Sequence, residues 1–130
     1  PSIPGPGVLS LQKNYLYDFS SSTEADFKNF FTPGAYPFVS PGSCNMSDIT
    51  PGILIFWVES ASGEAWGTRM RSANQEGSSF TIVGIEDGHN LAGDYFVKVK
   101  SRFNCTLYNN ASGEAIALTD GEMVSYFIRP

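Results

Sequence analysis

The chain contains one histidine, His89, which follows Glu86 and Asp87 in a short polar segment. A hydrolytic triad would need this imidazole to be held by a carboxylate and to face a nucleophile. The Gly-x-Ser-x-Gly sequence of a nucleophile elbow does not occur. An exposed histidine in a turn between two strands is the simpler interpretation. We therefore predict no catalytic residue, and the protein is not expected to be an enzyme.

A metal site would draw on three residues, Cys44, Cys105 and His89, and no two of them are closely spaced. Zinc needs three or four such ligands, so we predict no metal and no cofactor. The two cysteines could form one disulfide bond or stay reduced. Cys105 alternates with Phe103 and Leu107, which favours a buried free thiol.

The charge balance excludes two classes of partner. The 130 residues include 13 acidic and 8 basic side chains, giving a net charge of −5 without a cluster of Lys and Arg. Nucleic acids and anionic membrane surfaces both require such clusters. The longest apolar run, Ile53–Val58, is far shorter than the roughly 20 residues of a membrane-spanning helix. We expect no nucleic-acid partner and no membrane insertion.

Three segments with turn-forming residues could contact a ligand, at 60–64, 73–79 and 86–94. Each joins two expected strands and combines polar side chains with glycine, and recognition concentrates in such loops. Trp66 alternates with small and polar residues and is expected at the surface, whereas Trp57 ends an apolar run and is expected inside. The candidate ligand-binding residues are Trp66, Asn74, Gln75, Glu76, Asp87, His89 and Asn90. The alternative is that these are ordinary solvated turns.

The elements expected to position these residues are short strands. Apolar residues alternate with polar ones along most of the chain, which is the period of a half-buried strand. About nine strands are predicted, at Leu9–Phe19, Ala35–Val39, Ile53–Val58, Ala65–Arg71, Phe80–Ile85, Tyr95–Lys100, Phe103–Tyr108, Ala115–Leu118 and Met123–Ile128.

Glycines predict where the chain turns. Gly63, Gly77, Gly88, Gly113 and Gly121 each follow a polar residue, and each is expected to adopt a positive φ in a hairpin turn. The pentapeptide Ala-Ser-Gly-Glu-Ala occurs twice, at 61–65 and 111–115. Because its flanks keep no fixed period, we interpret it as a turn used twice and not as a structural repeat.

One segment predicts a helix, at about Glu24–Phe31. Ser and Thr residues precede it as N-caps, acidic residues fall in its first turn, and Phe27, Phe30 and Phe31 share one face. Pro33 follows and ends it. The three phenylalanines are expected to cover one open end of the sheet core.

These elements predict an all-β fold. We expect an antiparallel β-sandwich, jelly-roll or knob-like, with one short helix. Residues 1–7, rich in Pro and Gly, are typical of a linker. Residues 8–130 would form the domain, which we expect to be the C-terminal domain of a longer chain.

Two stretches carry a resemblance to a known group of proteins. Residues 25–36, with the sequence ADFKNFFTPGAY, resemble the short helix, Thr-Pro-Gly and aromatic opening of tailed-bacteriophage fibre and pyocin knob domains. The run GILIFWV at 52–58, the turn at Gly63 and residues 65–71 fit the strands that follow in that pattern. Residues 103–128 are similar to the last strands of fibre, spike and tail-needle head domains. The segment 74–94 matches nothing in the pattern, and its usual Asn before the helix-end Thr is displaced to Asn29.

The resemblance implies a knob at the distal end of a homotrimeric tail appendage, located in the virion. Such a knob would recognise a glycan, a protein or a small ligand on the host surface, or plug the tail tip. No catalytic residue is carried over, because these knobs bind and trimerise. The alternative is a carbohydrate-binding module of a secreted protein, which two tryptophans in a small all-β domain would also suit.

Overall fold

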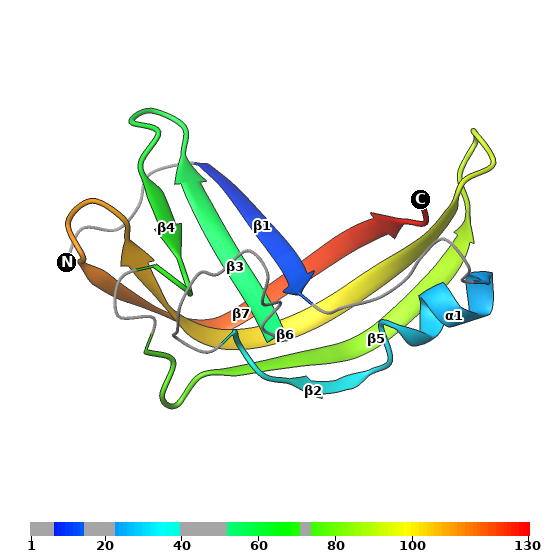
Figure 1. Cartoon of the computed structure of the whole chain (residues 1–130), viewed down its shortest axis with the longest axis horizontal. Helices are drawn as coiled ribbons and strands as arrows, with labels where there is room; N and C mark the ends of the chain where they lie inside the picture. Colours follow the sequence, from blue (N-terminus) through cyan, green and yellow to red (C-terminus); the bar gives the residue numbers. More distant parts are fainter. Residues whose placement is uncertain (1–6, 15–22, 40–51, 71–73) are drawn as a thin grey trace, which may run out of the picture.

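The structure is a computed structural model that describes residues 7–14, 23–39, 52–70 and 74–130 (Figure 1). These residues form seven strands and one helix. In chain order they are β1 (Gly7–Asn14), α1 (Glu24–Asn29), β2 (Gly34–Tyr36), β3 (Gly52–Glu59), β4 (Ala65–Gly67), β5 (Ser79–His89), β6 (Tyr95–Asn109) and β7 (Ala115–Ile128). All the strand pairs are antiparallel, so the predicted all-β antiparallel fold with one short helix is confirmed.

The strands form one sheet in the order β1-β3-β4-β6-β5-β2, and β7 pairs with the second edge of β6. β6 is the central strand. It pairs with β5 over its first two thirds, with β4 at Tyr108 and Asn109, and with β7 along almost its whole length. Figure 1 shows the β1-β3-β4 part crossing over the β5-β6-β7 part. The sheet therefore folds over into two layers.

One side of this sandwich is closed by hydrogen bonds. After β2, the backbone at Phe38 forms a parallel bridge to Ile53 of β3, with the Val39 N–H donating to the Ile53 carbonyl at 3.0 Å. The path β3-β4-β6-β5-β2 thus returns to β3. On the opposite side, β1 and β7 each pair with one strand only among the described residues.

The core lies between the two layers. Alternate residues of β6 point inward from Tyr95 to Leu107, as the period of a strand requires. They meet Ile53 and Ile55 from β3, and all of these side chains are buried. Burial of each such side chain contributes roughly 1.5–3 kcal/mol, so this layer contact is the main stabilising element.

The helix covers one end of the core, as predicted. Thr23 caps it: the Thr23 Oγ1 accepts from the Asp26 N–H at 3.1 Å, and the Asp26 carboxylate accepts from the Thr23 N–H at 3.0 Å. Phe27 and Phe31 are buried, and the Phe31 ring stacks on Phe127 of β7 with 4.6 Å between centroids. The helix ends at Asn29, two residues earlier than expected. It is also too short to cross a membrane, and it is the sole helix among the described residues.

The predicted number of strands is wrong, because four expected strands merge into two. Residues 95–100 and 103–108 are both parts of β6, and residues 115–118 and 123–128 are both parts of β7. β5 also continues past Ile85 to His89, whereas β4 ends at Gly67. The expected continuation of β1 to Phe19 lies outside the described residues, as does part of the expected strand to Arg71.

Three of the five predicted turn glycines are confirmed: Gly63, Gly77 and Gly113 have φ values of 72°, 79° and 75°. The other two predictions are wrong, because Gly88 lies within β5 and Gly121 within β7. In both copies of the repeated pentapeptide, the glycine N–H donates to the carbonyl four residues earlier, at 2.8 and 2.9 Å. The prediction of one turn used twice therefore holds in detail.

Candidate functional site

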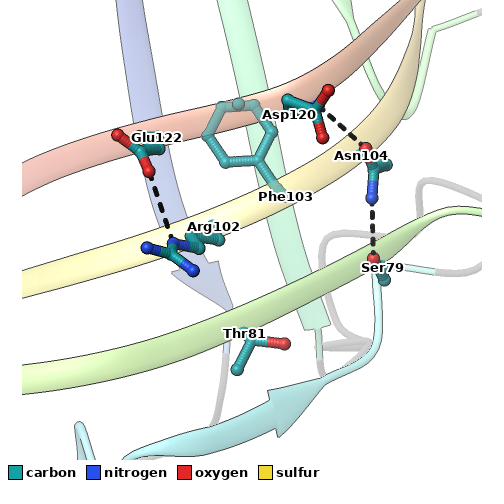
Figure 2. A pocket seen from close by; sticks show the side chains of 8 residues that line it. Ser79, Thr81, Arg102, Phe103, Asn104, Asp120 and Glu122 are labelled. Carbon is teal, nitrogen blue, oxygen red and sulfur yellow. Dashed lines mark hydrogen bonds and ion pairs between the residues drawn. The ribbon is translucent and has the colours of Figure 1, made fainter.

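A polar depression of about 380 Å³ lies on the outward face of the β5-β6-β7 layer (Figure 2). Three neighbouring strands supply its lining because their registers bring outward-facing residues together. Ser79 is opposite Asn104, and Thr81 is opposite Arg102, which is opposite Glu122. The lining residues are Ser79, Thr81, Arg102, Phe103, Asn104, Asp120, Gly121 and Glu122.

A β-bulge in β7 shapes this depression. Two residues of β7, Thr119 and Asp120, lie opposite the single residue Asn104 of β6. Asp120 has a φ of 54°, the left-handed conformation that Asp and Asn tolerate better than most residues. The Asn104 Oδ1 accepts from the Asp120 N–H at 2.9 Å, and the Asn104 Nδ2 donates to the Ser79 Oγ at 3.3 Å. Asn104 thus ties all three strands together at the bulge.

A close approach between Gly121 and Phe103 completes the depression. A Cβ atom on Gly121 would lie 2.5 Å from a ring carbon of Phe103, so glycine alone fits above this ring. Phe103 is buried and stacks on Phe80, with 6.3 Å between the ring centroids. The Phe103 ring is therefore packed on the inner face of the layer, beneath the depression.

The charges in the depression are balanced and exposed. The Arg102 Nε lies 3.3 Å from the Glu122 Oε1, and both side chains are about 70% exposed, so the ion pair is weak. Figure 2 shows this pair on one side of the depression and Ser79, Asn104 and Asp120 on the other. Together they offer hydroxyl, amide, guanidinium and carboxylate groups. This mixture of donors and acceptors suits hydroxyl-rich ligands such as sugars.

The metal-ligating side chains of the described residues do not gather at one place. No group of three or more His, Cys, Asp or Glu side chains in the described ranges is placed to hold a metal ion. Cys105 is a free, buried thiol whose pKa is raised by burial to about 12, so it is protonated at neutral pH. Its partner in the alternative disulfide, Cys44, lies outside the described residues.

The expected exposure of Trp66 is wrong, whereas Trp57 packs against the core as expected. Trp66 is 2% exposed and belongs to the core, so it is no surface platform for a ligand. Trp57, directly opposite it on β3, is partly buried and packs against the same core cluster. Neither indole N–H has a hydrogen-bond partner among the described residues. The prediction failed because alternation defines the two faces of β4 but not which face is covered.

Gln75 has a structural role that the sequence did not indicate. Its Nε2 donates to the carbonyls of Thr68 and Thr106 at 2.8 and 2.7 Å, and its Oε1 accepts from the Thr106 N–H at 2.9 Å. The side chain thereby pairs with β6 as a strand residue would, between the ends of β4 and β5. Its neighbour Asn74 accepts the Glu76 N–H in a turn, which leaves Glu76 exposed. Of Asn74, Gln75 and Glu76, only Glu76 has a side chain without a hydrogen bond to another described residue.

Asp87 and His89 attach the helix to the sheet. The Lys28 Nζ lies 2.9 Å from the Asp87 carboxylate, and the Tyr95 hydroxyl donates to the same carboxylate at 2.9 Å. These two contacts, Lys28 first, lower the pKa of Asp87. The His89 Nε2 lies 2.8 Å from the Glu24 Oε1. His89 is therefore the last residue of β5 and not a turn residue.

The turn itself begins one residue later, at Asn90. The Asn90 Oδ1 accepts from the N–H groups of Ala92 and Asp94 at 3.0 and 2.9 Å. The Asn90 amide therefore stabilises the β5-β6 turn. The seven predicted site residues consequently do not converge on one site, and none of them lines the polar depression.

A second surface feature is an apolar groove along the open side of the sandwich. One end, about 340 Å³ in volume, is lined mainly by Leu9, Trp57, Leu107 and Leu118. At the helix end of the same side, Leu11, Phe31 and Phe127 line a further depression of about 360 Å³. The groove lies between β1 and β7, each of which has an unpaired edge among the described residues.

Comparison with known proteins gives no relative. No protein-family model matches the chain, and no curated protein and no solved structure matches it.

Proposed function

We propose that the protein is the distal knob domain of a trimeric bacteriophage tail appendage, a virion structural protein that contacts the host surface. It is a binding domain and not an enzyme. The polar depression at the β7 bulge is the observation that carries the proposal. It is exposed and lined by donors and acceptors from three strands, and a host glycan is the ligand that this chemistry suits best. The resemblance of residues 25–36 and 103–128 to fibre and tail-needle domains supplies the biological setting.

The apolar groove supports the trimer. Leu9, Trp57 and Leu118 line an open channel beside two unpaired strand edges, and natural proteins seldom leave such edges uncovered. A neighbouring copy that pairs with one of these edges would cover the groove. Because β1 and β7 are different strands, a β1-to-β7 contact is heterologous, and it closes into a trimer when neighbouring copies are related by a three-fold rotation.

The alternative, a carbohydrate-binding module of a secreted protein, is favoured by the polar depression alone. It predicts the same sugar-binding chemistry in a monomer. Oligomeric state therefore separates the two proposals.

Sedimentation equilibrium of the purified chain tests the assembly, and binding to a panel of bacterial envelope polysaccharides and whole bacteria tests the recognition. A trimer that binds at least one surface supports the tail-knob proposal. A monomer that binds a glycan supports the secreted module. A chain that binds no bacterial surface in either state overturns the tail-knob proposal.

A further inference from the structure

We infer that the outward face of the β5-β6-β7 layer binds an acidic glycan, one whose sugar rings carry carboxylate groups. The inference rests on the proposed function and specifies its ligand class. The surface, here called the outer trough, runs along β6 from Asn104 through Arg102, Lys100 and Lys98.

The trough is a continuous hollow. The polar depression shares Arg102 and Glu122 with a second depression of about 260 Å³, which in turn shares Lys100 with a third of about 90 Å³. The third lies where Gly84 of β5 faces Lys100. A Cβ atom on Gly84 would meet nothing within 4 Å, so this part of the sheet is open to a ligand.

Cationic side chains lie along the middle of the trough, and carboxylates line its margins. Three of the eight cationic residues of this acidic chain, Lys98, Lys100 and Arg102, alternate along the outward face of β6. Arg102 pairs with Glu122, and the Lys98 Nζ lies 3.8 Å from the Glu86 carboxylate. Lys100 is exposed and makes no ion pair with any described residue. Its strand neighbours are the uncharged Gly84 and Val124, so no carboxylate lies directly beside it on the adjacent strands, and an anionic group would complement it.

An aromatic platform stands at the end of the trough. Tyr126 is 61% exposed on the outward face of β7, and its ring centroid lies 5.8 Å from that of Phe96. A sugar ring can rest its apolar face on such a side chain while its polar edge stays in contact with water. Hydrogen-bonding groups, cations and an aromatic ring therefore follow one another along the trough, with the ring supplied by β7 beside Lys98 of β6, as an extended acidic oligosaccharide would require.

The experiment is isothermal titration calorimetry with three hexasaccharides: hexagalacturonate, an α2,8-linked sialic acid hexamer and neutral maltohexaose. We expect at least one acidic hexamer to bind more tightly than maltohexaose, and its affinity to fall as salt is added. Lys100→Gln should weaken that binding roughly tenfold, because it removes a charged hydrogen bond. Gly84→Phe should reduce it at least as much by filling the trough.

Lys28→Gln is the matched control, because it changes the net charge equally at the helix. It should leave the affinity unchanged, and thermal melts should show every variant to be folded. Failure of both acidic hexamers to bind, or an unchanged affinity in Lys100→Gln and Gly84→Phe, overturns the inference. If the chain then still binds an envelope polysaccharide, the proposed function survives and only the ligand class or the surface is wrong.

Discussion

Replacement of Gly121 by Ala tests the packing below the polar depression. The added methyl would lie 2.5, 2.7 and 2.8 Å from three ring carbons of Phe103, about 1 Å closer than ordinary carbon contacts. Phe103 is 4% exposed and stacks on Phe80, so its ring has little room to withdraw. Overpacking of this kind costs about 1–3 kcal/mol. For a domain of this size, each kcal/mol lowers the melting temperature by about 4 °C.

We therefore expect Gly121→Ala to lower the melting temperature by about 4–12 °C in calorimetry. Gly84→Ala is the control, since Gly84 also lies in a strand of this layer and a methyl group there has open space. The double variant Gly121→Ala with Phe103→Leu should be less destabilised than the sum of the two single changes. Equal stability of Gly121→Ala and Gly84→Ala would refute the assigned contact.

Three further predictions concern stability and reactivity. Gln75→Ala should lower the free energy of unfolding by about 2–3 kcal/mol in urea titrations, because it removes four hydrogen bonds, whereas Glu76→Ala should change it by less than about 0.5 kcal/mol. Burial lowers the pKa of Lys13 from 10.5 to about 8, so above pH 8 the unfolded chain binds more protons than the folded chain. Between about pH 7.5 and 9, the free energy of unfolding should therefore rise with pH more steeply in the wild type than in Lys13→Met. Identical slopes of the free energy of unfolding against pH would contradict this. Cys105 should react with iodoacetamide only after denaturation, as mass spectrometry would detect, because its thiol is buried and its pKa is raised to about 12.

The fold class was predictable because apolar and polar side chains alternate along most of the chain. The lengths of the strands were not. Ser101 interrupts the apolar side of β6, yet it is buried and its hydroxyl donates to the Met123 carbonyl at 3.4 Å. Asp87-Gly88 has the composition of a turn, but Asp87 is held by Lys28, and Gly88 lies against the Phe96 ring. In each case a tertiary contact overrides a local signal.

The candidate site was less predictable than the fold. Arg102, Asn104 and Glu122 occupy outward positions that in sequence are typical of a solvated face. Their convergence depends on which strands pair and in what register, and on a bulge that moves Asp120 out of alternation. The Asp120-Gly121 pair was a usable signal, but it indicated a hairpin turn where the structure has a bulge within one strand.

The position of β6 also has a consequence for how the domain folds. β5, β6 and β7 follow one another along the chain and are joined by short turns, so they can pair with little loss of loop entropy. β4 pairs with β6 through Trp66 and Asn109, which are much farther apart in the sequence. This pairing can form only after the end of β6 is ordered. We therefore expect the three-stranded meander at 79–128 to form first during folding. All the residues that line the outer trough belong to this meander. Its inward residues form the core, whereas outward residues such as Lys100, which alternate with them, can be exchanged without loss of core packing.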